Sequence, residues 1–86
     1  MSKGFVYILL SNKDYRSYVG STDDLEKRLI EHNQGKCKST KYRRPLKLIY
    51  QEEFNSLAEA RLREKFLKTR KGREELKEIF EKIKRS

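Results

Sequence analysis

Cysteine, histidine and glycine are scarce in this chain, and each scarcity excludes a kind of site. A single cysteine, Cys37, excludes an internal disulfide and a CxxC metal framework. A single histidine, His32, leaves too few ligands for zinc and would have to serve every role in a serine–histidine–aspartate triad. Four glycines, spread over the whole chain, do not form a phosphate-cradling loop. The remaining candidates for chemistry are tyrosines, arginines and carboxylates.

Long hydrophobic runs are also absent. No segment approaches the roughly 20 apolar residues that a membrane span requires, and residues 1–4 lack the layout of a signal peptide. We therefore expect no membrane partner and a cytoplasmic location. The length of 86 residues predicts one domain over 1–86, which buries about 60% of the surface of the unfolded chain.

Acidic residues are fewer than basic ones, and this imbalance indicates the kind of molecule that the protein binds. The 22 lysines and arginines exceed the 13 aspartates and glutamates, and the formal net charge is +9. Such an excess favours a polyanionic partner, because each phosphate that is neutralised releases condensed counterions. The alternative is an ordinary basic surface. A disordered basic tail is excluded by the periodic apolar runs.

Three apolar segments predict strands. Residues 5–10 form a continuous run of β-formers, typical of a strand that is buried on both faces. Residues 11–17 form a polar turn, and residues 18–21 resume an extended pattern. Because the connection is short, we expect an antiparallel hairpin. A third strand is predicted over residues 46–54.

Capping residues and helical spacing predict the helices. In the first, Asp23 is the expected N-cap, Glu26 its capping-box partner and Gly35 the residue that closes the helix. Arg28 and His32 lie four residues apart and so project from one side of it.

A second helix should begin at the N-cap Ser56, with Glu59 as the capping-box partner. Gly72 is expected to separate it from a last helix. The apolar positions at helical spacing are Leu57, Ala58, Leu62, Phe66 and Leu67, then Leu76, Ile79, Phe80 and Ile83. The order β-β-α-β-α-α predicts an α/β (α+β) fold, with a small three-stranded antiparallel or mixed sheet flanked by helices.

Four side chains could carry chemistry, and each also has a plain structural interpretation. Tyr7 and Tyr18 lie on the two strands of the hairpin and could bring two phenols together, or could simply fill the sheet. Arg28 is a phosphate ligand or a solvated charge. Glu64 lies among cations on the second helix, where it could be an ordinary ion-pair partner.

The chain resembles the GIY-YIG endonuclease family at an ordered series of motifs. Val6-Tyr7-Ile8 and Tyr18-Val19-Gly20 are similar to its two signature triplets. The series continues with Ser21-Thr22, Asp24-Leu25, Arg28-Leu29, His32-Asn33, Gly35, Tyr42-Arg43-Arg44-Pro45, Leu48-Ile49-Tyr50 and Ala60-Arg61-Leu62-Arg63-Glu64. The resemblance covers approximately residues 4–70. It is to the compact single-domain bacterial members, which are related to the amino-terminal domain of excinuclease C.

The resemblance implies roles for the candidate residues. Glu64 matches the metal-binding glutamate, which would hold Mg²⁺ or Mn²⁺ with waters and substrate oxygens. Tyr7 and Tyr18 match the signature tyrosines. One phenol, its pKa lowered from about 10 by a cationic neighbour or by the metal, would accept the proton of the attacking water, while the other orients the water or the phosphate. Arg28 matches the arginine that clamps the phosphate. His32 would give a second hydrogen bond, to phosphate or to tyrosine.

Three further expectations follow from the resemblance. Gly20 should let the backbone pass close to the substrate or to a helix. Ser21 stands where the excinuclease branch has a lysine that stabilises the phenolate, so Arg28, His32 or the metal would have to replace it. No additional DNA-binding module is expected. Nucleic acid would therefore be held by Lys36, Lys38, Lys41, Tyr42, Arg43, Arg44, Arg61 and Lys68, with Tyr42 stacking on an exposed base.

The function that the resemblance implies is metal-dependent hydrolysis of DNA phosphodiester bonds. The cut would be structure-selective or weakly specific, on duplex, branched or single-stranded DNA, with RNA not excluded, and would serve DNA repair or recombination. The alternative is a nucleic-acid-binding protein that keeps the fold but cleaves slowly or not at all, because a fold alone does not fix a function.

Overall fold

A computed structural model describes residues 3–85 as one sheet between two layers of helix. The elements are β1 (Gly4–Ser11), β2 (Ser17–Thr22), α1 (Leu25–Asn33), the short 3₁₀ helix η1 (Lys41–Arg43), β3 (Leu46–Phe54), α2 (Leu57–Leu67) and α3 (Arg70–Arg85). The predicted order β-β-α-β-α-α is confirmed. Residues 1, 2 and 86 of the predicted domain lie outside the described residues.

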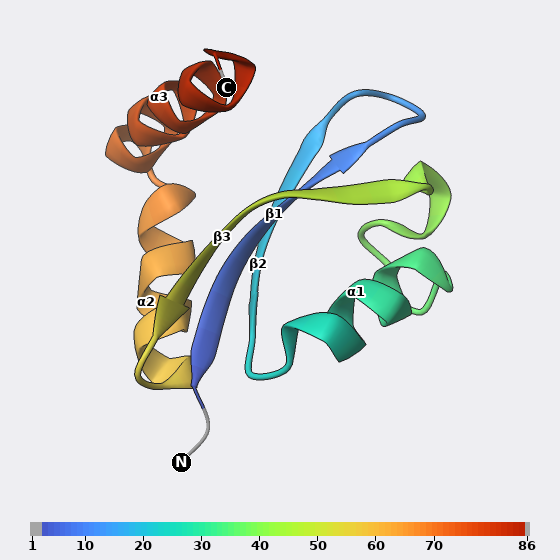
Figure 1. Cartoon of the computed structure of the whole chain (residues 1–86), viewed down its shortest axis with the longest axis horizontal. Coiled ribbons are helices and arrows are strands. Elements are labelled where there is room, and N and C mark those ends of the chain that lie inside the picture. Colours follow the sequence, from blue (N-terminus) through green and yellow to red (C-terminus); the bar gives the residue numbers. More distant parts are fainter. Residues whose placement is uncertain (1–2, 86) are drawn as a thin grey trace.

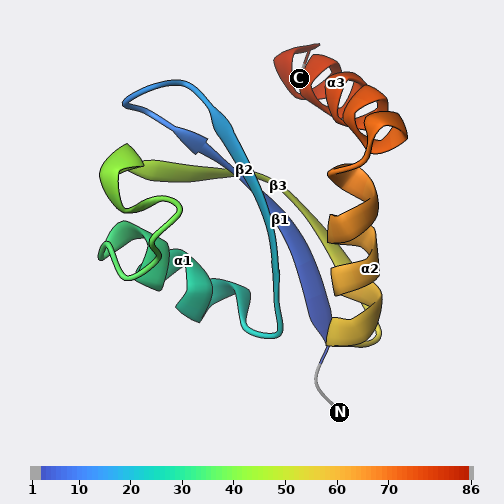
Figure 2. The same ribbon diagram turned by 180° about the vertical axis from the view of Figure 1, so that it is seen from behind.

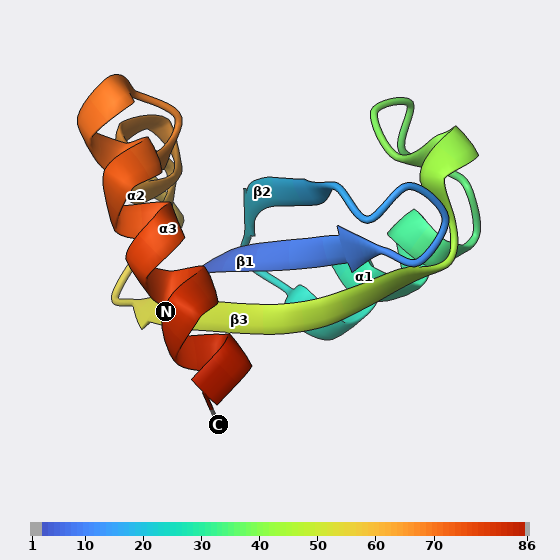
Figure 3. The ribbon, with the colours of Figure 1, turned by 90° about the horizontal axis from the view of Figure 1, so that it is seen from above.

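The sheet is antiparallel throughout, with the strand order β2-β1-β3. Figure 1 shows α1 on one side of the sheet and α2 on the other, and Figure 2 shows the same layers from behind. Seen from above, α2 and α3 lie together on one side of the strands (Figure 3). Within the described residues, no helix is both long and apolar enough to cross a membrane.

The central strand β1 is buried on both faces, as its continuous apolar run predicts. Because side chains alternate along a strand, Val6 and Ile8 pack against α2 and α3, while Tyr7 and Leu9 face α1. The first cluster also contains Val19, Ala60, Leu67 and Ile79, and the second contains Leu46 with Tyr18, Leu25, Leu29 and Leu48 packed against it. The core is therefore two thin apolar layers with β1 between them.

The β1–β2 register places the two signature tyrosines on the same face. Tyr7 pairs with Gly20, and Leu9 pairs with Tyr18. The two tyrosines are thus diagonal neighbours, since residues two positions apart on a strand share a face. The condition that the sequence left open, a register that brings the phenols together, is met.

The caps of the helices agree with the sequence in one case and differ in the other. Ser56 caps α2, accepting the backbone N–H of Glu59 at 3.2 Å. For α1 the predicted N-cap Asp23 is wrong: the helix begins one residue later, and Asp24 accepts the N–H of Lys27 at 3.2 Å. Glu26 then stands in the first turn, one position too early for a capping box. Gly35 follows the end of α1 with φ at +80°, a conformation that favours glycine.

Gly72 does not separate α2 from α3, contrary to the prediction. The break falls at residues 68–69, and Gly72 lies in the first turn of α3. A Cβ there would lie 2.5 Å from the Cα of Leu67, so the glycine lets α3 cross closely over the end of α2.

Arg63 of α2 joins the helices to the sheet through two ion pairs, to Glu52 of β3 at 2.8 Å and to Glu75 of α3.

Candidate active site

Three aromatic rings meet on the face of the sheet that α1 covers. The ring centroids of Tyr7 and Tyr18 are 6.3 Å apart, and the His32 ring lies 5.6 Å from Tyr7 and 5.2 Å from Tyr18. His32 is fully buried. Of its two proposed partners, phosphate or tyrosine, the structure supplies the tyrosine.

A chain of hydrogen bonds runs through this cluster. The Nε of Arg28 donates to the Tyr7 hydroxyl at 3.4 Å, and that hydroxyl lies 2.9 Å from Nε2 of His32. The other imidazole nitrogen, Nδ1, lies 2.7 Å from Oγ1 of Thr40. The expectation that Arg28 and His32 project from one side of their helix is confirmed, since both reach Tyr7. Thr40, which the sequence did not single out, completes the chain.

Burial controls the protonation of Tyr7. It raises the pKa of Tyr7 to about 12, and the hydrogen bond from Arg28 only partly opposes it. Arg28, the cationic neighbour of this phenol, therefore does not lower its pKa below the ordinary value. The reason is that the side chain is 1% exposed, and removing a phenolate from water costs more than one cationic neighbour returns. Tyr7 is a neutral phenol at neutral pH.

The same burial keeps His32 uncharged. It lowers the pKa of His32 to about 4, and the positive charge of Arg28 adds to the effect while Glu31 opposes it. At neutral pH the imidazole thus has one N–H donor and one acceptor nitrogen.

The burial of His32 predicts a loss of stability in mild acid. The unfolded imidazole binds a proton near pH 6.5 and the folded one near 4, so between these values the unfolded chain binds more protons. Above pH 6.5 the free energy of unfolding should be unaffected by this titration. It should fall by up to about 3 kcal/mol as the pH drops to 4. Urea unfolding at a series of pH values measures this loss. His32→Phe, which cannot bind the proton, should show a flatter dependence; equal slopes would contradict the assignment.

Arg28 joins the cluster to a cleft. Its pKa is raised above the ordinary value, first by the hydrogen bond to Tyr7, so it remains a cation. Its Nη1 lies 3.4 Å from Glu31, and the side chain is 37% exposed. It therefore reaches both the buried phenol and the solvent.

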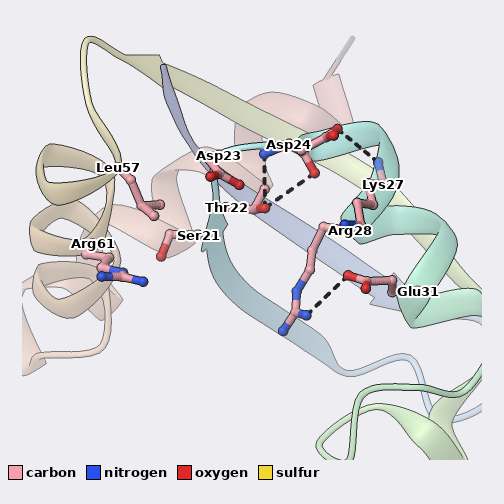
Figure 4. Close-up of a pocket in the computed structure, with 9 residues that line it drawn as sticks. All are labelled: Ser21, Thr22, Asp23, Asp24, Lys27, Arg28, Glu31, Leu57 and Arg61. Atoms are coloured by element: carbon pink, nitrogen blue, oxygen red, sulfur yellow. Dashed lines mark hydrogen bonds and ion pairs between the residues drawn. The ribbon is translucent and has the colours of Figure 1, made fainter. Parts of the chain in front are cut away.

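The cleft, of about 400 Å³, lies between α1 and α2 (Figure 4). Figure 4 shows Arg28 reaching into it from α1 and Arg61 from α2, with the Ser21 hydroxyl between them. The other lining residues are Thr22, Asp23, Asp24, Lys27, Glu31 and Leu57. Two guanidinium groups on opposite walls suit a phosphate that lies between them.

Glu64 reaches the edge of the sheet from α2. Its Oε1 accepts a hydrogen bond from the Ser21 hydroxyl of β2 at 2.5 Å, and its Oε2 lies 2.6 Å from Nζ of Lys68. The same ammonium lies 5.8 Å from the centroid of the Tyr18 ring. Lys68 thus links Glu64 to the aromatic cluster. Among the described residues, Glu64 makes no hydrogen bond or ion pair with Tyr7, Tyr18 or Arg28.

The donor set at Glu64 fits a hard divalent cation that keeps most of its waters. Mg²⁺ is commonly held by one or two carboxylates together with water and substrate phosphate oxygens. Glu64 supplies one carboxylate, 23% exposed, with the Ser21 hydroxyl beside it. Nowhere in residues 3–85 do three or more histidine, cysteine, aspartate or glutamate side chains gather in a way that could hold a metal ion.

Lys68 lies beside Tyr18. The sequence predicted only a contact to nucleic acid for this lysine. Ser21 leaves the position of the excinuclease lysine without a cation, and Lys68 brings one from the other helix layer to within 5.8 Å of the Tyr18 ring centroid. The spacing of Glu64 and Lys68, four residues apart on one helix, was the signal in the sequence. Their common proximity to Tyr18 depends on how α2 packs on β2, which the spacing does not show.

Gly20 makes room for a phenol rather than for substrate. A Cβ at this position would lie 2.5 Å from Cζ of Tyr7 and 3.0 Å from Cε1 of Tyr18. The close approach that the sequence predicted is therefore to the cross-strand tyrosine. A glycine here allows both aromatic rings to occupy the same face of the hairpin.

Six of the eight predicted nucleic-acid residues lie between α1 and β3, whereas Arg61 lies on α2 and Lys68 at its end. Most are exposed on the segment between α1 and β3: Lys36, Lys38, Lys41, Tyr42 and Arg44. Tyr42 is 75% exposed, with Nζ of Lys41 at 5.4 Å from its ring centroid. Arg43 differs, because it pairs with Asp14 at 3.1 Å and ties η1 to the β1–β2 turn. Figures 1 and 3 show this turn and η1 at the same end of the sheet.

Comparisons with known proteins show a matching family model and similar full-length relatives. A family model described as the GIY-YIG catalytic domain matches residues 3–77. The chain is 45% identical over 82 residues to a UPF0213 protein of Staphylococcus saprophyticus, covering 94% of this chain and 99% of that protein. It is 46% identical over 81 residues to a UPF0213 protein of Syntrophus aciditrophicus, covering 92% of each.

A solved structure shares the fold. The solution NMR structure of a UPF0213 protein from Bacillus halodurans matches with a TM-score of 0.52 at 35% identity, covering 90% of this chain and 84% of that one. The three-stranded antiparallel sheet flanked by three helices is therefore the architecture of a solved relative as well.

Proposed function

The chain belongs to the GIY-YIG family, and from this membership together with the geometry of the site we propose that it is a metal-dependent endonuclease hydrolysing DNA phosphodiester bonds. The GIY-YIG domain points to a nuclease family. The observation that carries the proposal is the buried link from Arg28 through Tyr7 to His32, beside Tyr18 and the Glu64–Lys68 pair. All four chemical groups that the family motif assigns are present, and a site no longer used would tolerate the loss of one.

In the proposed reaction the oxygen of a water attacks phosphorus as the bond to the leaving 3′-oxygen breaks. The water gives up one proton to a base, and the leaving oxygen takes up one proton from solvent. Arg28 neutralises the charge that builds on the non-bridging oxygens, which is worth most where water is excluded. Mg²⁺ or Mn²⁺, when bound at Glu64, would supply Lewis-acid stabilisation of the phosphate and of the leaving oxygen.

Exposure favours Tyr18 over Tyr7 as the phenol that meets the water. The Tyr7 hydroxyl is buried and already bonded to Arg28 and His32. Tyr18 is half-buried, and its hydroxyl makes no hydrogen bond to any described residue, so it is free to take a water or a phosphate oxygen. Tyr7 then orients Arg28, and Lys68 provides the cation beside Tyr18.

Binding, in this proposal, comes from the exposed cations that lead from the cleft to the α1–β3 segment. Arg61 lines the cleft, and Lys36, Lys38, Lys41 and Arg44 lie on the segment. Such contacts position the backbone of the nucleic acid and do not read its bases. DNA with unpaired bases is the substrate that Tyr42 suits, since an exposed ring can stack on a base. A role in cytoplasmic DNA repair or recombination is consistent with that preference.

Tyr42→Ala should weaken binding to single-stranded DNA about tenfold, because one base–aromatic stack is lost. Duplex affinity should change less than about twofold, since paired bases are not available for stacking. Fluorescence anisotropy with the two labelled DNAs measures both. Tyr42→Phe is the matched control and should bind like the wild type. Equal losses on both DNAs would contradict stacking by Tyr42.

The affinity of the wild-type protein for DNA should also fall steeply with salt, because cations contact the phosphates. A flat salt dependence would contradict those phosphate contacts.

The experiment that tests the function is a panel of labelled substrates incubated with Mg²⁺ and with Mn²⁺. The panel should contain duplex, single-stranded, flapped and junction DNA, with RNA counterparts. Cleavage of at least one DNA is expected, with those carrying unpaired bases cut fastest. Tight, salt-sensitive binding without cleavage of any member would instead establish the alternative of a non-cleaving nucleic-acid-binding protein.

A further inference from the structure

Thr40 is a buried hydroxyl at the end of the active-site hydrogen-bond chain, and the family motif gives it no role. Its Oγ1 lies 2.7 Å from Nδ1 of His32, and both residues are fully buried. Its backbone is held independently of the hydroxyl: its N–H donates to the carbonyl of Cys37 at 3.2 Å, and its carbonyl accepts from the N–H of Arg43 at 2.9 Å. The side chain is therefore free to serve His32.

The donors and acceptors set the direction of the chain. Arg28 can only donate, so the Tyr7 oxygen must accept from it. The phenol proton then needs an acceptor, and within the described residues the only one in reach is Nε2 of His32. An imidazole that accepts at Nε2 while neutral carries its proton on Nδ1, which donates to Thr40.

The reverse direction is less favourable. If Thr40 donated to Nδ1, Nε2 would donate to Tyr7, and the phenol oxygen would receive two N–H groups while its own buried proton had no acceptor. A phenol is the stronger donor of the two hydroxyls, since its pKa is near 10. Leaving its proton unpaired therefore costs more than leaving that of an aliphatic hydroxyl unpaired.

We propose that Thr40 is a positioning residue: by accepting from Nδ1 it holds His32 in the Nδ1–H tautomer, so that Nε2 accepts from Tyr7 and the Tyr7 oxygen holds Nε of Arg28. Removing the hydroxyl leaves the buried Nδ1–H without an acceptor and so weakens the preference for this tautomer; wherever the proton moves to Nε2, the Tyr7 oxygen receives a donor from His32. In those molecules the Tyr7 hydroxyl holds Nε of Arg28 less firmly. The role of this hydrogen-bond chain in catalysis rests on the proposed function, but the tautomer of His32 does not.

The test uses the fact that the chain has one histidine, so its imidazole nitrogens are the only ones in an NMR spectrum. In ¹⁵N-labelled wild-type protein at neutral pH, Nδ1 should be protonated and Nε2 bare. Thr40→Val, which keeps the shape and removes the hydroxyl, should shift the ring toward the Nε2–H tautomer. Thr40→Ser, which restores the hydroxyl, should keep the wild-type pattern. Backbone amide spectra establish that each variant is folded.

The cleavage assay adds a second readout. Removing a residue that orients a metal ligand typically costs 10–100-fold. By analogy, Thr40→Val should cut about tenfold more slowly under single-turnover conditions, with Thr40→Ser within about twofold of the wild type. An Nε2–H tautomer in the wild type, or no shift in Thr40→Val, would overturn the proposal. Thr40→Ser behaving like Thr40→Val would overturn it as well. Absence of cleavage by the wild type would count against the proposed function and leave the tautomer result to decide the role of Thr40.

Discussion

Glu64→Gln is expected to lower metal-dependent DNA cleavage by about 10³-fold, the loss that follows when about 4 kcal/mol of charge stabilisation by a bound metal is removed. Glutamine has nearly the same shape and can still accept the hydrogen bond from Ser21. It cannot offer an anionic oxygen to a divalent cation. The measurement is a time course of nicking at saturating protein, with and without Mg²⁺.

DNA binding by Glu64→Gln should stay within about twofold of the wild type or tighten slightly, because the change removes a negative charge and frees Lys68. Glu78→Gln is the matched control, since it makes the same chemical change at an exposed position on α3. Its cleavage should be normal. Full cleavage by Glu64→Gln, or an equal loss in Glu78→Gln, would remove the metal-binding role from Glu64.

Arg28→Lys is expected to lower the catalytic rate by about 10²–10³-fold with little change in KM, as is typical when a donor to the developing charge is lost. Lysine keeps the positive charge but loses the planar guanidinium that can hold two phosphate oxygens. It also loses the Nε–H that joins Arg28 to the Tyr7 hydroxyl. Single-turnover rates over a range of DNA concentrations separate the two parameters.

Lys27→Gln is the matched control for Arg28. Lys27 lines the same cleft one residue earlier and, unlike Arg28, makes no side-chain bond to the aromatic cluster within residues 3–85. Its replacement should raise KM and reduce the salt dependence of binding, with the rate at saturation nearly unchanged. A higher KM at an unchanged rate in Arg28→Lys would make Arg28 an anchor for DNA and not part of the chemistry.

The sequence could predict the elements of this fold because most of its signals are local. The apolar run of β1, the bounds of β3 and the Ser56 cap each depend on a few neighbouring residues, and each is confirmed. Two predictions are wrong although the residues that decide them are near in sequence: Asp24 and not Asp23 caps α1, and Gly72 packs against Leu67, five residues earlier. Gly72 is placed by the crossing of α3 over Leu67, and local pattern gives no information on that crossing.

The site shows the same division. The tyrosines, Arg28 and Glu64 could be named from motifs, and the register and helix spacing bring the first three together. Burial could not be read from those motifs, and it raises the pKa of Tyr7. Thr40 gave no signal because a threonine in a polar connection is ordinary. Its importance comes only from the loop that brings it to His32.

We propose that Tyr7, Tyr18, Arg28 and Glu64 form one metal-dependent hydrolytic site. The most direct measurement is nicking of a supercoiled plasmid by the wild-type protein, first with Mg²⁺, then with excess EDTA, then with Mg²⁺ restored. We expect nicks to accumulate, to stop on chelation and to resume when the metal returns. Nicking that continues in EDTA would contradict this expectation, as would plasmid and flapped DNA that are both bound but stay intact with Mg²⁺ and with Mn²⁺.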